Sequence, residues 1–256
     1  MVIGLERFRD YFTGYQDQYI IIGGTACDIS LMEAGLPFRR TKDLDLVLIL
    51  ESYTPAFGRR LREFISEGRY RNHERSDGKP QAYRFDKPQE PGFPQMIELL
   101  CRSDSVFDSI SNRYRFIPIS EDMENLSAII MDDDYYQLLG AGKYVIDGIP
   151  LLSPPYLILL KAKAWLNLAA ELASGVRSND HNLEYNVRKH MDDVARLAVL
   201  LPVNFSCTVA HNIHADLHRF IEAFATAPPD LVKLGISEVG IDDIVDTLLR
   251  CFKTGY

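Results

Sequence analysis

The segment "KDLDLVLIL" at residues 42–50 places the strongest constraint on the fold of this chain. Neighbouring side chains of a β-strand point to opposite faces, so the leucines of this segment share one face and Asp43 and Asp45 the other. An apolar run, "YIII", ends on Gly23 and Gly24 shortly before it, and the helical spacing of "TACDISLMEAG" lies between the two. The pattern predicts strand, glycine turn, helix and strand, with two carboxylates side by side at the start of the second strand.

Two carboxylates held roughly 7 Å apart along a strand can bind a divalent cation between them. Carboxylate oxygens with room for water and phosphate suit Mg²⁺ or Mn²⁺ better than zinc. Without a cation, Asp43 and Asp45 would repel each other. The alternative is that both are solvated acids at the edge of a strand.

The glycine turn adds a second chemical feature. A helix that begins at "GGT" offers backbone N–H groups and the positive end of its dipole to an anion such as phosphate. A phosphate-binding turn beside a pair of metal-binding carboxylates is the arrangement that phosphoryl or nucleotidyl transfer needs.

A third carboxylate is expected from a neighbouring strand, and Glu98 in "PQMIELLC" is the lone charge of an apolar run. It could complete a metal site or deprotonate an acceptor hydroxyl. The structural alternative is an ion pair with Arg102 that offsets the cost of burying an acid.

The rest of the chain predicts an α+β fold, with a mixed sheet flanked by helices and then a helical domain. We expect a helix at 54–68, strands at 81–86, 94–101 and 112–120, and short strands between 133 and 153 with a hairpin turn at Asp147–Gly148. Helices are expected at 155–173, 180–200, 207–226 and 237–253. The predicted domains are 1–150 and 151–256.

The motif "IIGGTA…FRRTKDLDLVLIL" resembles the hG[GS]…Dh[DE]h signature of the DNA polymerase β-like nucleotidyltransferase superfamily. The form "RRTKDLD" is similar to the AbiEii-type branch, the toxins of abortive-infection toxin–antitoxin pairs. The later segments "YLILLKAKAW" and "VRKHMDDVARLAVLL" resemble that branch's helical motifs. The chain departs from the branch at His190, where an acid is expected.

The resemblance implies a metal-dependent enzyme that moves a nucleotidyl group from a nucleoside triphosphate (NTP), ATP among them, to an acceptor hydroxyl. It implies a cleft between the two halves, with a site built from three sets of residues. The implied nucleotide-binding residues are Gly23, Gly24, Thr25, Arg40, Thr41 and Lys161. The implied metal ligands, also catalytic, are Asp43, Asp45 and Glu98. Lys161 and Asp193 complete the catalytic set, with Lys161 on the triphosphate. Lys163 would point away from Lys161, because the two are only two residues apart on a helix.

The acceptor stays open between tRNA, a protein and a small molecule of the antibiotic type, and an antitoxin partner is possible. The net charge of −8 disfavours a broad nucleic-acid surface, whereas the arginine-rich stretch 59–87 could form a local basic patch. A nucleotide-binding module without catalysis is the non-enzymatic alternative. The absence of a long apolar run and of a signal-peptide pattern predicts a cytoplasmic protein with no membrane partner. The four scattered cysteines are expected as free thiols, and His211, His214 and His218 as a polar helix face rather than a zinc site.

Overall fold

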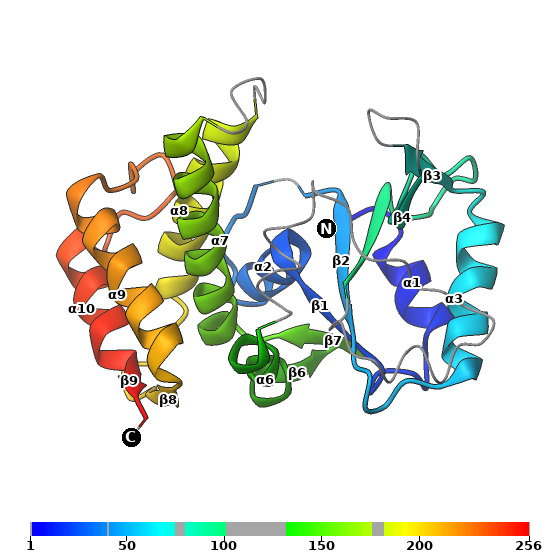
Figure 1. Cartoon of the computed structure of the whole chain (residues 1–256), viewed down its shortest axis with the longest axis horizontal. Helices are drawn as coiled ribbons and strands as arrows, with labels where there is room; N and C mark the ends of the chain where they lie inside the picture. The colour runs from blue at the N-terminus through cyan, green and yellow to red at the C-terminus, as the bar shows by residue number, and fades with distance from the viewer. Residues whose placement is uncertain (1, 40, 75–79, 101–131, 176–181, 256) are drawn as a thin grey trace. The chain divides into compact units, whose positions relative to one another are not determined.

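The computed structural model describes residues 2–39, 41–74, 80–100, 132–175 and 182–255 (Figure 1). The chain divides into two compact units. The first comprises Met1–Ile29 and Phe38–Leu152, and the second comprises Ser30–Pro37 and Ser153–Tyr256. The second unit therefore includes a short segment from the N-terminal part of the chain as well as the helices that follow residue 152.

The first unit is built on a seven-stranded mixed sheet with the strand order β3-β4-β5-β2-β1-β7-β6. The strands are β1 (Tyr19–Ile22), β2 (Asp43–Leu48), β3 (Arg71–Glu74), β4 (Pro80–Asp86), β5 (Met96–Leu100), β6 (Lys143–Ile146) and β7 (Ile149–Leu152). β2 lies antiparallel to β1 and parallel to β5, and β1 lies parallel to β7. β2 thus has a strand on each side, which explains why its leucines and valine are fully buried.

Two helices, α1 (Leu5–Tyr11) and α3 (Pro55–Glu67), pack on one face of this sheet. The Tyr19 ring of β1 stacks on Phe57 of α3 at a centroid distance of 5.9 Å and meets Phe8 of α1 edge to face at 5.5 Å. The α3 helix begins where the sequence suggests, because the Thr54 hydroxyl accepts the Phe57 N–H and Pro55 occupies the first turn. This aromatic layer identifies the face of the sheet that α1 and α3 cover.

Strand alternation then determines what lies on the opposite face. Tyr19 and Ile21 share the face covered by α1 and α3 with their β2 partners Leu48 and Leu46. Asp45 is the partner of Ile22, one position out of phase, so Asp43 and Asp45 lie on the face away from α1 and α3. The opening helix α2 (Gly23–Glu33) follows β1 directly, without an intervening loop.

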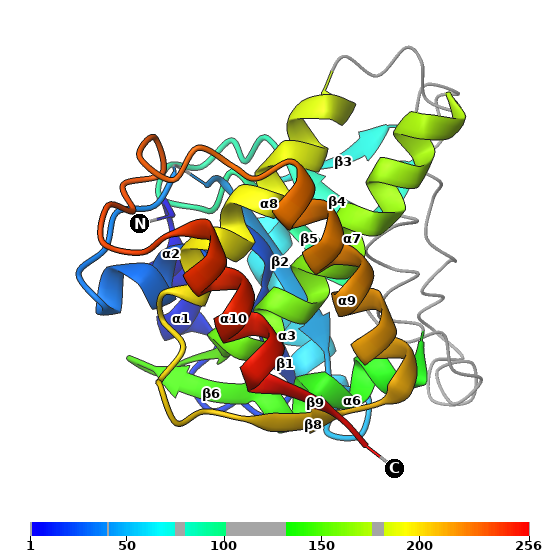
Figure 2. The ribbon, with the colours of Figure 1, turned by 90° about the vertical axis from the view of Figure 1, so that its left-hand side faces the viewer.

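The second unit is mainly helical. It contains α7 (Pro154–Ser174), α8 (Leu183–Ala198), α9 (His211–Thr226) and α10 (Ile241–Cys251), which run alongside one another in Figure 2. A small parallel sheet pairs β8 (Cys207–Val209), which precedes α9, with β9 (Phe252–Thr254), which follows α10. The α+β class, with a mixed sheet, flanking helices and a helical C-terminal part, agrees with the prediction.

Several sequence predictions need correction. Residues 133–142 form a helix, α6 (Asp133–Gly142), not a strand: Asp132 caps it through its Oδ1, and its apolar residues are spaced for one helical face. The first residues assigned to a helix at 207–226 form β8, and α1, β3 and β9 were not predicted. The hairpin turn is confirmed, with Asp147 and Gly148 at φ +49° and +79° between β6 and β7. The strand predicted at 112–120 lies outside the described residues.

Within the described ranges, no helix combines the length and the apolar character that crossing a bilayer would require. Cys27, Cys207 and Cys251 are free thiols, as predicted, and Cys101 falls outside the described part of the chain.

Candidate functional site

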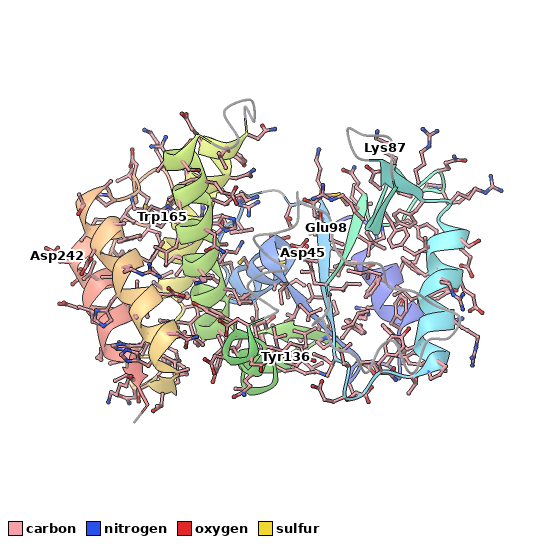
Figure 3. The ribbon with its side chains drawn as sticks, viewed as in Figure 1. Asp45, Lys87, Glu98, Tyr136, Trp165 and Asp242 are labelled. Carbon is pink, nitrogen blue, oxygen red and sulfur yellow. The ribbon has the colours of Figure 1, made fainter. Side chains whose placement is uncertain are left out.

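Asp43, Asp45 and Glu98 lie on one face of the sheet in the first unit. Asp45 of β2 and Glu98 of β5 are direct partners in the parallel register, and Asp43 stands two residues before Asp45. Partners on adjacent strands are about 5 Å apart, so the three residues are neighbours on this face of the sheet. Figure 3 labels Asp45 and Glu98 on these neighbouring strands.

Glu98 has a partner that the sequence did not indicate. It is only 8% exposed, and its Oε1 accepts hydrogen bonds from the guanidinium of Arg84, its register partner on β4. Arg102, the partner considered from the sequence, lies outside the described residues. The alternation of "YRFD" placed Arg84 on one face of a strand, but only the register with β5 reveals that this face is the one that carries Glu98.

The donor set suits a hard cation only in part. Asp43 and Asp45 are half-buried acids with the oxygen donors that Mg²⁺ and Mn²⁺ prefer. Among the residues that the structure describes, however, no three His, Cys, Asp or Glu side chains are grouped so that they could hold a metal ion. The two aspartates therefore fit a divalent cation, whereas the Glu98 carboxylate is hydrogen-bonded to Arg84.

The Gly23 backbone makes room for the Asp45 carboxylate. A Cβ on Gly23 would lie 2.9 Å from Asp45 Cγ and would overlap its Oδ2, and Gly23 has a φ of +68°, which disfavours any side chain. Two features therefore require a glycine at position 23: its backbone conformation and the close approach of the Asp45 carboxylate. This contact links the β1–α2 turn physically to the carboxylate face of β2.

Gly24 and Thr41, both expected at the nucleotide, also lie together. A Cβ on Gly24 would come within 2.7 Å of Thr41 Oγ1 and 3.4 Å of Arg39 Nη2. Thr25, also expected at the nucleotide, is fully buried, and its hydroxyl donates to the Asp43 carbonyl oxygen at 2.5 Å. Its side chain therefore ties α2 to β2. Arg40 lies outside the described residues.

Lys161 and Asp193, the two site residues predicted in the helical half, form an ion pair within the second unit. Lys161 Nζ lies 2.8 Å from Asp193 Oδ2, and the two residues are 5% and 0% exposed. The pair joins α7 to α8. A buried lysine with a buried acid is a costly arrangement to keep unless the geometry is good, so this contact fixes the packing of the two helices.

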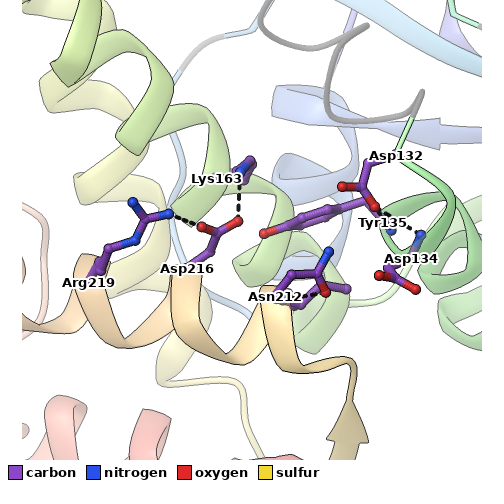
Figure 4. Close-up of polar contacts among 8 residues, drawn as sticks. Asp132, Asp134, Tyr135, Lys163, Asn212, Asp216 and Arg219 are labelled. Atoms are coloured by element: carbon purple, nitrogen blue, oxygen red, sulfur yellow. Dashed lines mark hydrogen bonds and ion pairs between the residues drawn. The ribbon is translucent and has the colours of Figure 1, made fainter.

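Lys163 points to a different helix, as its spacing from Lys161 predicts. Its Nζ lies 2.7 Å from Asp216 Oδ2 on α9, and Asp216 also accepts from Arg219 one turn later (Figure 4). Asp216 is 5% exposed, whereas Arg219 reaches the surface. The two lysines of α7 therefore anchor two different neighbours of that helix.

Two arginines of the stretch 59–87 contact other residues of the first unit. In the arginine-rich stretch, Arg60 stacks over Tyr11 and Arg69 pairs with Glu90 at 3.2 Å, so part of the expected basic patch is used within the first unit. The rings of His214 and His218 lie 4.4 Å apart on α9. Burial, aided by His218 and His211, lowers the pKa of His214 from its ordinary value.

Comparisons with known proteins add one similarity. No protein-family model matches the chain, and no curated protein sequence matches it. The chain is similar to the crystal structure of an antigenic nucleotidyltransferase-like protein from Paracoccidioides brasiliensis, with 17% sequence identity and a TM-score of 0.48. The similarity covers 98% of this chain and 94% of that one.

Proposed function

We propose that the protein is a metal-dependent nucleotidyltransferase. The observation that supports this most is the contact between the β1–α2 turn and the carboxylate face, where the Asp45 carboxylate occupies the space that a side chain at Gly23 would need. A glycine turn that opens a helix, where a phosphate could bind, thereby lies against a strand that carries two acids, next to Glu98 of the adjacent strand.

Each group has a proposed role. Asp43 and Asp45 would hold a Mg²⁺ or Mn²⁺ ion, which would offset the negative charge of the triphosphate. The N–H groups at Gly23, Gly24 and Thr25 would face the phosphates, at the start of a helix whose dipole favours an anion. Lys161, with Asp193, is proposed for the triphosphate on the family resemblance alone.

The reaction is an in-line displacement at the α-phosphorus. The oxygen of an acceptor hydroxyl forms a bond to that phosphorus, the bond from phosphorus to the bridging α–β oxygen breaks, and pyrophosphate leaves. The hydroxyl proton passes to a base. Glu98 is proposed to orient the hydroxyl or to take its proton, and Arg84 holds its carboxylate in position.

The finer assignment is an AbiEii-like toxin that acts on tRNA or on a protein and is neutralised by an antitoxin. It rests on the resemblance of "RRTKDLD" (Arg39–Asp45) to that branch. Induced expression in a bacterial host tests it: wild type should arrest growth and Asp45→Asn should not. Equal growth of both strains would favour the alternative hypothesis of a small-molecule acceptor.

The general proposal is tested by thermal unfolding with each of the four NTPs, with and without Mg²⁺, on wild type and on Asp45→Asn. Ligand at about 100 times its dissociation constant adds roughly 2.7 kcal/mol to the free energy of unfolding. A magnesium-dependent rise in Tm with at least one NTP, lost in Asp45→Asn, is the expected result. Binding that ignores both Mg²⁺ and Asp45 would point to a non-catalytic nucleotide-binding module, and no rise with any NTP would contradict the proposal.

A further inference from the structure

A groove of about 490 Å³ lies in the first unit at the edge of the sheet where β2 and β5 begin and β4 ends. Its volume is within the range of about 300–1,000 Å³ that small-molecule sites occupy. The groove is lined by charged residues at the strand ends and by apolar side chains from Met96 and the segment 88–93. Asp43, one of the two proposed metal ligands, forms part of its wall.

Part of the groove wall belongs to the carboxylate face of the sheet. Asp43, Met96 and Asp86 are register partners across β2, β5 and β4, and all three line the groove. The next row on the same face, two residues further along each strand, consists of Asp45, Glu98 and Arg84. Moving along the strands by two residues, or roughly 7 Å, therefore leads from the groove to the proposed catalytic carboxylates.

The groove and the glycine turn lie on opposite sides of β2. The turn follows β1, on one side of β2, whereas the groove extends over β5 and β4, on the other side. In an in-line displacement, the entering and leaving oxygens lie on opposite sides of the phosphorus. If the triphosphate lies at the glycine turn, the acceptor would approach Asp43 from the opposite side. The groove lies on that side.

Apart from Asp43, which is proposed as a metal ligand, each acid that lines the groove has another contact. Glu90 contacts Arg69 at 3.2 Å, and Asp86 has a further polar contact of its own. Lys42 and Lys87 are exposed, and within the described part of the chain neither takes part in an ion pair or a side-chain hydrogen bond. Lys42 directly precedes β2 and Lys87 directly follows β4, so the two cations lie on either side of Met96.

We propose that this groove binds the acceptor, and that the acceptor is a hydroxyl compound that carries a phosphate group. Lys42 and Lys87 bind the phosphate, apolar groups around Met96 contact the rest of the molecule, and the hydroxyl points toward Asp43. The inference rests on the proposed nucleotidyl transfer and extends it to the substrate class. A phosphodiester of a short RNA and the phosphate of a sugar phosphate share this chemistry.

Lys87 offers a variant that separates binding from folding. Its backbone has a φ of +49°, which is uncommon for a residue with a side chain. Lys87→Gly removes the cation and relieves the backbone, so it should not lower the Tm. Combined with Lys42→Ala, it removes both proposed phosphate ligands, and Lys253→Ala, at an exposed lysine of β9, is the matched control.

The test measures the dissociation constants of two probes, a tetraribonucleotide with a free 3′-hydroxyl and ribose 5-phosphate, on wild type and variants. Wild type should bind at least one probe, and the Lys42→Ala/Lys87→Gly double variant should bind it at least about tenfold more weakly, while Lys253→Ala should bind as wild type does. With the oligonucleotide, the dependence of log K on log salt should also become shallower by about one to two. The probe that binds identifies the source of the phosphate.

The magnesium-dependent effect of NTP on the Tm is measured on the same variants. It should persist in the double variant, since the lysines are assigned to the acceptor and not to the donor. Loss of the NTP effect in the double variant would assign the lysines to the donor and overturn the inference. So would the failure of both probes to bind wild type, or equal binding by wild type and the double variant; absence of the NTP effect in wild type would instead refute the proposed function.

Discussion

Gly23→Ala tests whether the glycine turn and Asp45 form one site. A methyl group at Gly23 would overlap the Asp45 carboxylate and would sit on a backbone with φ +68°. The left-handed conformation costs about 1–2 kcal/mol for a residue with a Cβ. Displacing a packed neighbour typically costs a further 1–3 kcal/mol. We therefore expect the free energy of unfolding to fall by roughly 2–5 kcal/mol in total.

Two glycines of the same chain serve as matched controls. Gly14, in the same unit, has φ +89°, and Gly175 has the same φ of +68° as Gly23; a Cβ at either would meet nothing within 4 Å. Gly14→Ala and Gly175→Ala should therefore show only the conformational cost of about 1–2 kcal/mol. The excess measured for Gly23→Ala over these controls is the cost of moving the Asp45 carboxylate.

Urea unfolding of the three variants measures these differences, and thermal unfolding with NTP and Mg²⁺ measures the function. Gly23→Ala should lose the magnesium-dependent rise in Tm, because Asp45 can no longer stand where the turn holds it. The two controls should keep it. A Gly23→Ala protein that is no less stable than Gly14→Ala, or that responds to NTP as wild type does, would refute the proposed coupling of the turn to the carboxylate.

Three further outcomes are expected. Lys161→Met and Asp193→Asn should each lower the free energy of unfolding by about 3–5 kcal/mol, because each leaves a buried charge without its partner. The double variant Lys161→Met/Asp193→Leu should recover most of this loss. Urea unfolding curves in which the double variant is the least stable of the three would argue against a buried pair. Because the pKa of His214 is lowered in the fold, the unfolded chain binds the proton first, so stability should fall as the pH drops through about 6.5. In urea titrations at pH 7.5 and 5.5, His214→Gln should reduce the difference in free energy of unfolding between the two pH values. An unchanged difference would show that another group causes the pH dependence. Thr25→Val should cost about 1 kcal/mol, a decrease in Tm of roughly 2–4 °C, since it removes the hydrogen bond to the Asp43 carbonyl; an unchanged Tm would show that this bond adds nothing.

The sequence predicted the features that depend on local periodicity. The alternation in "KDLDLVLIL" is enough to place Asp43 and Asp45 on one face, because the two-residue repeat of a strand needs no knowledge of its neighbours. Likewise, Asp147–Gly148 encodes its turn in two residues. The separation of Lys161 from Lys163 follows from helix geometry alone.

Features that depend on the pairing of distant segments could not be predicted. The contact of Glu98 with Arg84 requires the register of β4 on β5, and the strands β8 and β9 are three residues each and pair across more than forty residues of sequence. The segment from Asp133 to Gly142 was misread for another reason. Its closely spaced apolar residues are compatible with both a strand and a helix, and the cap at Asp132 decides in favour of the helix.

The membership of Ser30–Pro37 in the second unit has a practical consequence for dissecting the protein. The boundary between the units falls at three places along the chain, after Ile29, Pro37 and Leu152. A truncation at residue 152 therefore yields an N-terminal fragment that still carries a piece of the other unit, and a C-terminal fragment that lacks that piece. Neither unit can be obtained whole by one cut, so each would have to be made by joining separate segments of the sequence.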